Sequence, residues 1–143
     1  MKAITIKQPY ATLLALGYKQ YETRSWATTY RGDFAIHAGK TMDRKAFEDA
    51  EIVELLKAAG YQNMKELPLG AVIATCTLVN CMKITKNAPH QGYAMTEKTR
   101  IDGIAYKLGD FSEGRYAWVF ENMQMLTKSI SMNGRLSIWD LNI

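Results

Sequence analysis

One long apolar run, residues 71–84 (AVIATCTLVNCMKI), limits the folds open to this chain more than any other stretch. It is long for a β-strand, and its apolar side chains change parity near Leu78 and Val79. Because successive side chains of a strand point to opposite faces, that change predicts a bend or a β-bulge. A bent central strand is typical of a sheet that curls into a small barrel.

Other stretches predict shorter strands and two main helices. Apolar runs or alternating patterns indicate strands at residues 3–6, 20–26, 32–38, 115–123 and 136–141. One helix begins near Pro9, where the apolar spacing becomes helical, and stops at Gly17. A second helix runs from an N-cap at Asp43 to Ala59. Residues 85–114 are interrupted by Pro89 and several glycines, which predicts mainly loop with one short helix.

These elements predict an α+β fold: a small mixed β-barrel of five to six strands with two main flanking helices. A chain of 143 residues with 48% hydrophobic content is expected to form a single domain, residues 1–143. The strand order cannot be derived from the pattern.

The cysteines and histidines indicate neither a disulfide nor a metal site. Cys76 and Cys81 share one predicted strand, roughly 16 Å apart along it, which is too far for a disulfide. His37 and His90 are the only histidines, so no metal site is expected, and no cofactor is predicted. Free thiols, and the lack of a long apolar segment, favour a cytoplasmic protein without a membrane partner.

Positive charge is concentrated in two parts of the sequence, although the net charge is only +4. Residues 1–40 carry six Lys/Arg against two acidic residues, and residues 71–109 carry five against two. Residues 41–70, between them, are acidic. If the two basic segments meet in the fold, they form a surface for a polyanion. The alternative is an ordinary solvated surface.

The densest polar cluster spans residues 19–26 (KQYETRSW). In an extended strand Glu22 and Arg24 project from the same face, with Cα atoms roughly 6.6 Å apart. Lys19 has the opposite parity, but in a turn between helix and strand its amine can swing to the same side. The three side chains can then address one ligand. The alternative is a solvated strand with an ion pair worth under about 1 kcal/mol.

Six more residues near this cluster are candidates for ligand binding. Gln8 and Tyr10 lie at the start of the first expected helix, where free backbone N–H groups can hold an anion. Trp26 can stack a base, although aromatic residues of a small barrel usually belong to the core. The other candidates follow in the sequence: Tyr30, Arg31 and His37. For Arg31 the alternative is turn geometry, and for His37 it is a structural, hydrogen-bonded role.

Residues 6–40 (IKQPYATLLALGYKQYETRSWATTYRGDFAIHAGK) resemble the signature region of ASCH domains. That signature has Q-P-Y/W at a helix start, then G-x-K-x-x-E-x-R, an aromatic residue, and R-G before an apolar strand. Three later stretches also fit: PLGAVIATCTLVNC, EGRYAWVFENM and the closing strand with Trp139. The resemblance therefore covers most of the chain.

The resemblance implies a β-barrel similar to the PUA fold (pseudouridine synthase and archaeosine transglycosylase), which occurs mostly in RNA-interacting proteins. It also implies a cleft beside the first helix, lined by signature residues that correspond to Lys19, Glu22 and Arg24. ASCH domains have been proposed to bind RNA, and some relatives are reported to act on nucleic acids or modified nucleosides.

One branch of that family hydrolyses N4-acetylcytidine with a lysine, a threonine three residues later and a glutamate on the central strand. The lysine corresponds to Lys19. The threonine position holds Glu22, with Thr23 adjacent, and the glutamate position falls near Cys76, in a stretch without acidic residues. Efficient hydrolysis of N4-acetylcytidine is therefore not expected.

Together these patterns favour a small protein that binds RNA or a nucleotide-like ligand, with single-stranded nucleic acid among the candidate partners. Lys19 and Arg24 would hold a phosphate or a base edge, and Glu22 would orient them. A base would stack on one of three aromatic residues: Tyr10, Trp26 or Tyr30. The alternative is a hydrolase acting on a modified nucleoside or on RNA, with Lys19 and Glu22 as catalytic residues. A third class, a protein-interaction adaptor, has no support beyond the acidic helix.

Overall fold

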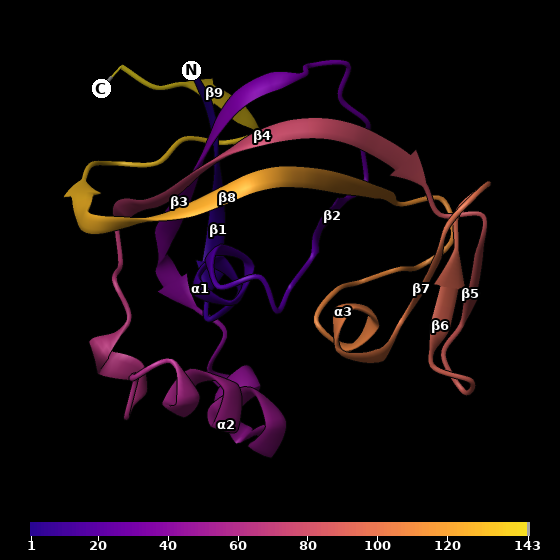
Figure 1. Ribbon diagram of the computed structural model, residues 1–143, viewed down its shortest axis with the longest axis horizontal. Coiled ribbons are helices and arrows are strands. Elements are labelled where there is room, and N and C mark those ends of the chain that lie inside the picture. Colours follow the sequence, from indigo (N-terminus) through magenta and orange to yellow (C-terminus); the bar gives the residue numbers. More distant parts are fainter. Residues whose placement is uncertain (143) are drawn as a thin grey trace.

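The computed structural model describes residues 1–142, and within them it shows a mixed α+β fold with nine strands and three α-helices. Six strands form one sheet in the order β2-β8-β4-β3-β1-β9 (Figure 1). Their bounds are β1 Lys2–Gln8, β2 Tyr21–Arg24, β3 Gly32–Met42, β4 Ala71–Lys83, β8 Tyr116–Ser131 and β9 Ile138–Asp140. β1 and β3 pair in parallel, whereas all other neighbours in this sheet are antiparallel.

Strand β4 confirms the irregularity expected from its sequence. Its register against β8 shifts at three points: Val72/Ala74, Thr75/Thr77 and Leu78/Asn80. The last shift coincides with the parity change in the apolar pattern. Such shifts increase the local twist of a strand, and β4 and β8 curve side by side along much of their length (Figure 1).

The mixed α+β fold is confirmed but the small barrel is not, because the two edge strands do not pair with each other within residues 1–142. In the described part of the chain, β2 pairs only with β8, and β9 reaches no further along β1 than Ile4. Both edge strands are short, with four and three residues. A side chain spans part of the unclosed side instead, since Nη2 of Arg24 in β2 donates to the carbonyl of Thr5 in β1 at 3.0 Å.

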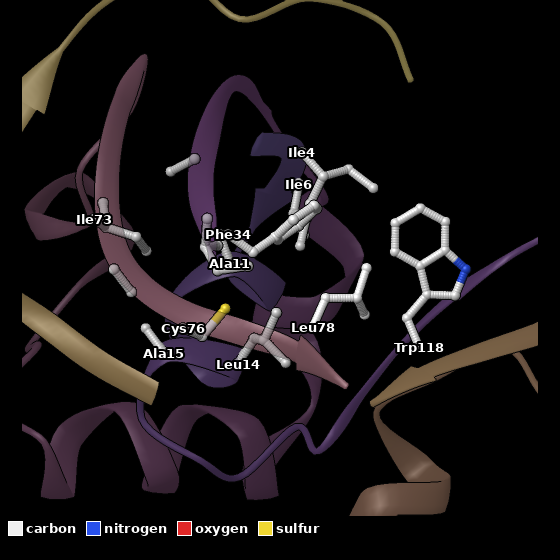
Figure 2. Close-up of a cluster of buried hydrophobic side chains, with 13 residues drawn as sticks. Ile4, Ile6, Ala11, Leu14, Ala15, Phe34, Ile73, Cys76, Leu78 and Trp118 are labelled. Carbon is white, nitrogen blue, oxygen red and sulfur yellow. The ribbon is translucent and has the colours of Figure 1, made fainter. Parts of the chain in front are cut away.

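Helix α1, Tyr10–Ala15, packs into the space that the curved sheet partly encloses. Gly17 follows it with φ of 89°, a left-handed conformation that glycine adopts without strain, and so ends the helix as expected. Figure 2 shows Leu14 and Ala15 of this helix beside Cys76 of β4, inside one apolar cluster. The helix is thereby fixed against the sheet, and the turn after it is positioned.

Six apolar residues that alternate along β1, β3 and β4 are all buried: Ile4, Ile6, Phe34, Ile36, Val72 and Ala74. One face of β1, β3 and β4 packs on α1, and the indole of Trp118 closes that cluster (Figure 2). The other face is covered as well, since Ala35 packs with Trp139 and Leu141. Because both faces of β3 are covered, His37 is buried rather than lying on a solvated face.

The prediction of a single helix from Asp43 to Ala59 is wrong. The segment forms a 3-10 helix, η1 Arg44–Glu48, followed by helix α2 Ala50–Ala58. Asp49 separates them, because its backbone is extended and its side chain accepts hydrogen bonds from the N–H groups of Glu51 and Ile52. Aspartate is a strong N-cap, so a new helix begins there. A short 3-10 helix, η2 Met64–Glu66, precedes β4.

Residues 85–114, expected to be mainly loop, contain a small antiparallel sheet. It consists of β5 Lys86–Ala88, β6 Tyr93–Met95 and β7 Arg100–Asp102, and helix α3 Gly103–Lys107 follows (Figure 1). Its apolar residues form a separate cluster with residues of the adjoining segments: Ile84, Ala94, Ile101, Ala105, Phe111 and Ala117. These residues are too widely spaced in the sequence to show the apolar periodicity of a strand or a helix.

Both cysteine thiols are free. Cys76 is buried, and the loss of solvation raises the pKa of its thiol to about 12. No helix within residues 1–142 combines the length and hydrophobicity needed to cross a membrane.

Candidate functional site

A first cavity of about 520 Å³ lies at the unclosed side of the six-stranded sheet. Residues 5–7 of β1 and residues 22–24 of β2 form two of its walls, and residues 107–110 with Arg115 form a third. Since β9 reaches only to Ile4, residues 5–7 have no strand partner on that side. The first cavity therefore lies between β1 and β2, at the place where the sheet does not close.

Lys19 enters the cavity from the turn between α1 and β2. Its backbone N–H donates to the Leu13 carbonyl at 3.1 Å, which fixes the turn and frees the side chain from strand parity. The Lys19 ammonium donates to the Leu108 carbonyl at 2.9 Å and lies 3.7 Å from Oε1 of Glu22. Only 4% of Lys19 is exposed, and this burial lowers the pKa of its ammonium, with Glu22 acting in the opposite direction.

Glu22 and Arg24 project from the same face of β2, as their spacing predicts. Nε and Nη2 of Arg24 donate to Oε2 of Glu22 at 3.1 and 2.8 Å. The other carboxylate oxygen faces Lys19, so each oxygen of Glu22 serves a different cation. Nη1 of Arg24 makes no hydrogen bond to residues 1–142, and the side chain is partly exposed, so this donor is available to a ligand.

The residues of the third wall were not predicted to belong to the site, because the sequence of residues 85–114 predicts mainly loop. Arg115 donates from Nη2 to the Thr23 carbonyl at 3.0 Å and lies 3.5 Å from Asp110. Lys107 pairs with Asp49 and Glu51 at 3.0 and 2.9 Å. Nothing in the sequence pattern links these residues to the cluster at residues 19–24, because tertiary packing alone brings the two segments together.

A second cavity, of about 570 Å³, adjoins the first and shares Thr5, Lys7 and Arg24 with it. Its outer wall is the segment of residues 132–137 between β8 and β9, which we call the strap. Lys40 in β3 donates to Asn133 of the strap at 3.2 Å, which ties the wall to the sheet. No pattern in the sequence predicted this cavity.

His37 lines the second cavity, but both of its ring nitrogens are engaged. Nε2 lies 2.8 Å from the Met132 carbonyl, which can only accept, so Nε2 carries the hydrogen. Nδ1 then accepts from the Thr5 hydroxyl at 3.1 Å, and that hydroxyl accepts from the indole N–H of Trp139 at 3.2 Å. This complete chain of hydrogen bonds favours the structural role for His37.

The other candidate residues separate into two groups. Tyr10 lines the first cavity, with the Lys19 ammonium 5.8 Å from the centre of its ring. Four candidates line neither cavity: Gln8, Trp26, Tyr30 and Arg31. Gln8 is fully buried and exchanges hydrogen bonds with Thr12 in α1, and Trp26 packs edge-on against Trp118.

Tyr30 and Arg31 shape the turn before β3. The Tyr30 hydroxyl donates to the Asp33 carbonyl at 2.6 Å, and Nη1 of Arg31 donates to the carbonyls of Thr28 and Tyr30. Neither side chain is brought to Lys19, Glu22 and Arg24. Within residues 1–142, no group of three or more His, Cys, Asp or Glu side chains is placed to hold a metal ion.

The fold and the cavity define a mixed α+β protein whose Lys–Glu–Arg cluster lies beside its first helix. The family model of the ASCH domain matches residues 4–129, and the chain belongs to the ASCH domain family. The resemblance seen in the signature residues is thereby confirmed.

The chain is also similar to activating signal cointegrator 1 of Homo sapiens and of Mus musculus. In both comparisons the identity is 23% over 141 residues, which covers 97% of this chain. The chain spans about 22% of the length of these two relatives.

Proposed function

We propose that the protein binds single-stranded nucleic acid, with RNA preferred, at the first cavity and the surface around it. The observation that carries the proposal is the charge of the two adjoining cavities. Seven Lys/Arg residues and two carboxylates line them, a balance of +5, whereas the whole chain has a net charge of +4. A concave surface that holds the positive charge of a protein is typical of polyanion binding.

The side chains of the first cavity suit one nucleotide. Arg24 offers its Nη1 group to a phosphate or a base edge, while Glu22 keeps the guanidinium in place. Tyr10 is the one of the three stacking candidates that lines the cavity, and it can stack a base. The likeness of ASCH domains to the PUA fold, common among RNA-interacting proteins, supports the same assignment.

Replacement of Arg24 tests the proposal, with the exposed Arg44 on η1 as a matched control. Arg24→Ala is expected to weaken binding of a fluorescent oligouridylate by about 1–3 kcal/mol, the loss typical of a charge-assisted hydrogen bond. Arg44→Ala removes the same charge outside both cavities and is expected to have little effect. Equal losses in the two variants would show diffuse electrostatic attraction and no site. Urea unfolding of both variants checks that they remain folded.

A second candidate function is hydrolysis of a modified nucleoside or of RNA in the same cavity. The observation that favours it is Lys19, a nearly fully buried lysine with a lowered pKa beside a carboxylate. Active sites commonly contain such perturbed groups, although structural ion pairs perturb pKa values as well. Product release from RNA or from modified nucleosides that is lost in Lys19→Ala would favour the enzyme over the binding protein.

A further inference from the structure

The second cavity differs from the first in the charge of its lining. Four cationic side chains line it: Lys7, Arg24, Lys40 and Arg135. No aspartate or glutamate is among its lining residues within the described chain. The first cavity, by contrast, contains the carboxylates of Glu22 and Asp110.

In the described chain, three of the four cations that line the second cavity have no carboxylate partner, whereas Arg24 is paired with Glu22. Within residues 1–142, Lys7, Lys40 and Arg135 form no salt bridge to any carboxylate. In the first cavity Lys19, Arg24, Lys107 and Arg115 each have a carboxylate within 4 Å. Clustered like charges raise the energy of a folded protein, and a bound anion relieves that repulsion.

The wall of the second cavity is held in place by packing and hydrogen bonds. Met132 donates its backbone N–H to Gly70 at 3.0 Å, and Lys40 donates to Asn133. At Gly134 the strap lies so close to β1 and β3 that a Cβ atom would be 2.5 Å from Oγ1 of Thr5. Residues 132–134 of the strap are therefore held against the sheet, and the four cations line the hollow that the strap forms with it.

We propose that the second cavity is a phosphate subsite, which holds a phosphodiester next to the nucleotide in the first cavity. This inference rests on the proposed function. Lys7 and Arg24 line both cavities, so a strand that passes from one to the other stays against cationic side chains. The first cavity, where every cation except Lys7 has a carboxylate partner, then accepts the base. The second cavity, where within residues 1–142 only Arg24 has such a partner, accepts the backbone charge.

The test compares two probes, uridine monophosphate and an oligouridylate of about six nucleotides, a length in the range that small single-strand-binding domains cover. The variant is Lys40→Gln/Arg135→Gln, which removes both charges and keeps polar side chains at the two positions. Oligouridylate affinity is expected to fall about tenfold, as removal of a charge-assisted hydrogen bond predicts. The slope of log K against log salt is expected to become shallower by about 0.7 for each phosphate that the variant no longer neutralises.

Two control pairs separate charge from packing. Arg44→Gln/Lys45→Gln removes the same two charges from η1, outside both cavities, and is expected to leave the affinity and the slope unchanged. Lys40→Arg/Arg135→Lys keeps both charges and is expected to retain binding. A tenfold loss of affinity in this charge-preserving pair would overturn the subsite, because the effect would then come from the strap.

The outcomes also separate the subsite from the proposed function. If the wild type binds the oligouridylate and Lys40→Gln/Arg135→Gln binds it equally well with the same salt slope, the subsite is wrong and the proposed function stands. If the variant loses as much affinity for uridine monophosphate as for the oligouridylate, the subsite is again wrong. If the wild type binds neither probe at low salt, both proposals are wrong.

Discussion

Glu22 organises the first cavity, because each of its carboxylate oxygens faces a different cation. The side chain is only 10% exposed, so these charges interact with little screening by water. Removing one partner of a buried ion pair costs much more than an exposed pair is worth, since a buried charge is left uncompensated. Glu22 is thus expected to support stability and the geometry of Arg24 at once.

The burial of Lys19 predicts a lowered pKa for its ammonium, which can be measured directly. Burial lowers the pKa of its ammonium below the usual 10.5, and Glu22 opposes that shift. In protein labelled with carbon-13 at its lysines, the Lys19 resonance is expected to titrate below the usual 10.5. In Glu22→Gln the midpoint is expected to fall further. A Lys19 midpoint at or above 10.5 would contradict the burial of this ammonium.

The same shift predicts how stability depends on pH. Between the lowered folded-state pKa and the usual 10.5, the unfolded chain holds a proton that the folded chain has lost. Stability therefore rises with pH through this window, and the penalty from Lys19 is greatest below it. The difference in unfolding free energy between wild type and Lys19→Met is expected to shift in favour of wild type as pH rises there. A flat difference in urea unfolding experiments would contradict this.

At the scale of elements, the strap depends on close approach at Gly134. A Cβ there would lie 2.5 Å from Oγ1 of Thr5 and 2.8 Å from the His37 ring. Gly134→Ala is therefore expected to lower the unfolding free energy by about 1–3 kcal/mol, the usual cost of overpacking. Ser129→Ala, at an exposed position of β8, serves as the control in urea unfolding. An unchanged stability in Gly134→Ala would show that the strap does not lie against Thr5 and His37.

Several elements could be predicted from the sequence because their signals are local. The alternation of β1 and β3, the stop at Gly17 and the parity change in β4 each report backbone geometry within a few residues. The break at Asp49 was missed because the apolar pattern continues across it, whereas the capping bonds decide the outcome. The sheet β5-β6-β7 was missed because its strands have only three residues each.

The same limit applies to the candidate site. Residues 19–24 bring three charged side chains together through local geometry, so their spacing was informative. The walls from residues 107–115 and from the strap meet that cluster only through long-range packing, which single-sequence patterns do not report. Gln8 and Trp26 were candidates for ligand binding because of their positions in the sequence. In the structure, Gln8 forms hydrogen bonds with α1, and Trp26 packs against the core.

At the scale of the whole molecule, the sheet stays open where β1 and β2 face each other, and both cavities adjoin Arg24 there. An open side leaves strand residues 5–7 and the side chains of β2 accessible to a ligand. Seven Lys/Arg residues and two carboxylates line the cavities at this side, whereas residues 41–70 carry an acidic excess. In the proposed function, this side is the one that contacts the polyanion.

The architecture also predicts a negative result with N4-acetylcytidine. Cys76, at the position of the glutamate in the hydrolase branch of the family, lies in the apolar core, and no residue of β4 within the described chain lines the first cavity. The purified protein is therefore not expected to release cytidine from N4-acetylcytidine efficiently, as followed by chromatography. Rapid release that is lost in Lys19→Ala would reverse the order of the two candidate functions.

The salt dependence of single-stranded RNA binding tests the central claim most directly. Each phosphate neutralised on a single strand contributes about −0.7 to the slope of log K against log salt. With phosphates held at the first cavity and its surroundings, a slope of roughly −2 to −3 is expected, with weak binding at physiological salt. Fluorescence anisotropy with an oligouridylate over a range of salt concentrations measures it. A slope near zero, or no binding even at low salt, would contradict nucleic-acid binding by this protein.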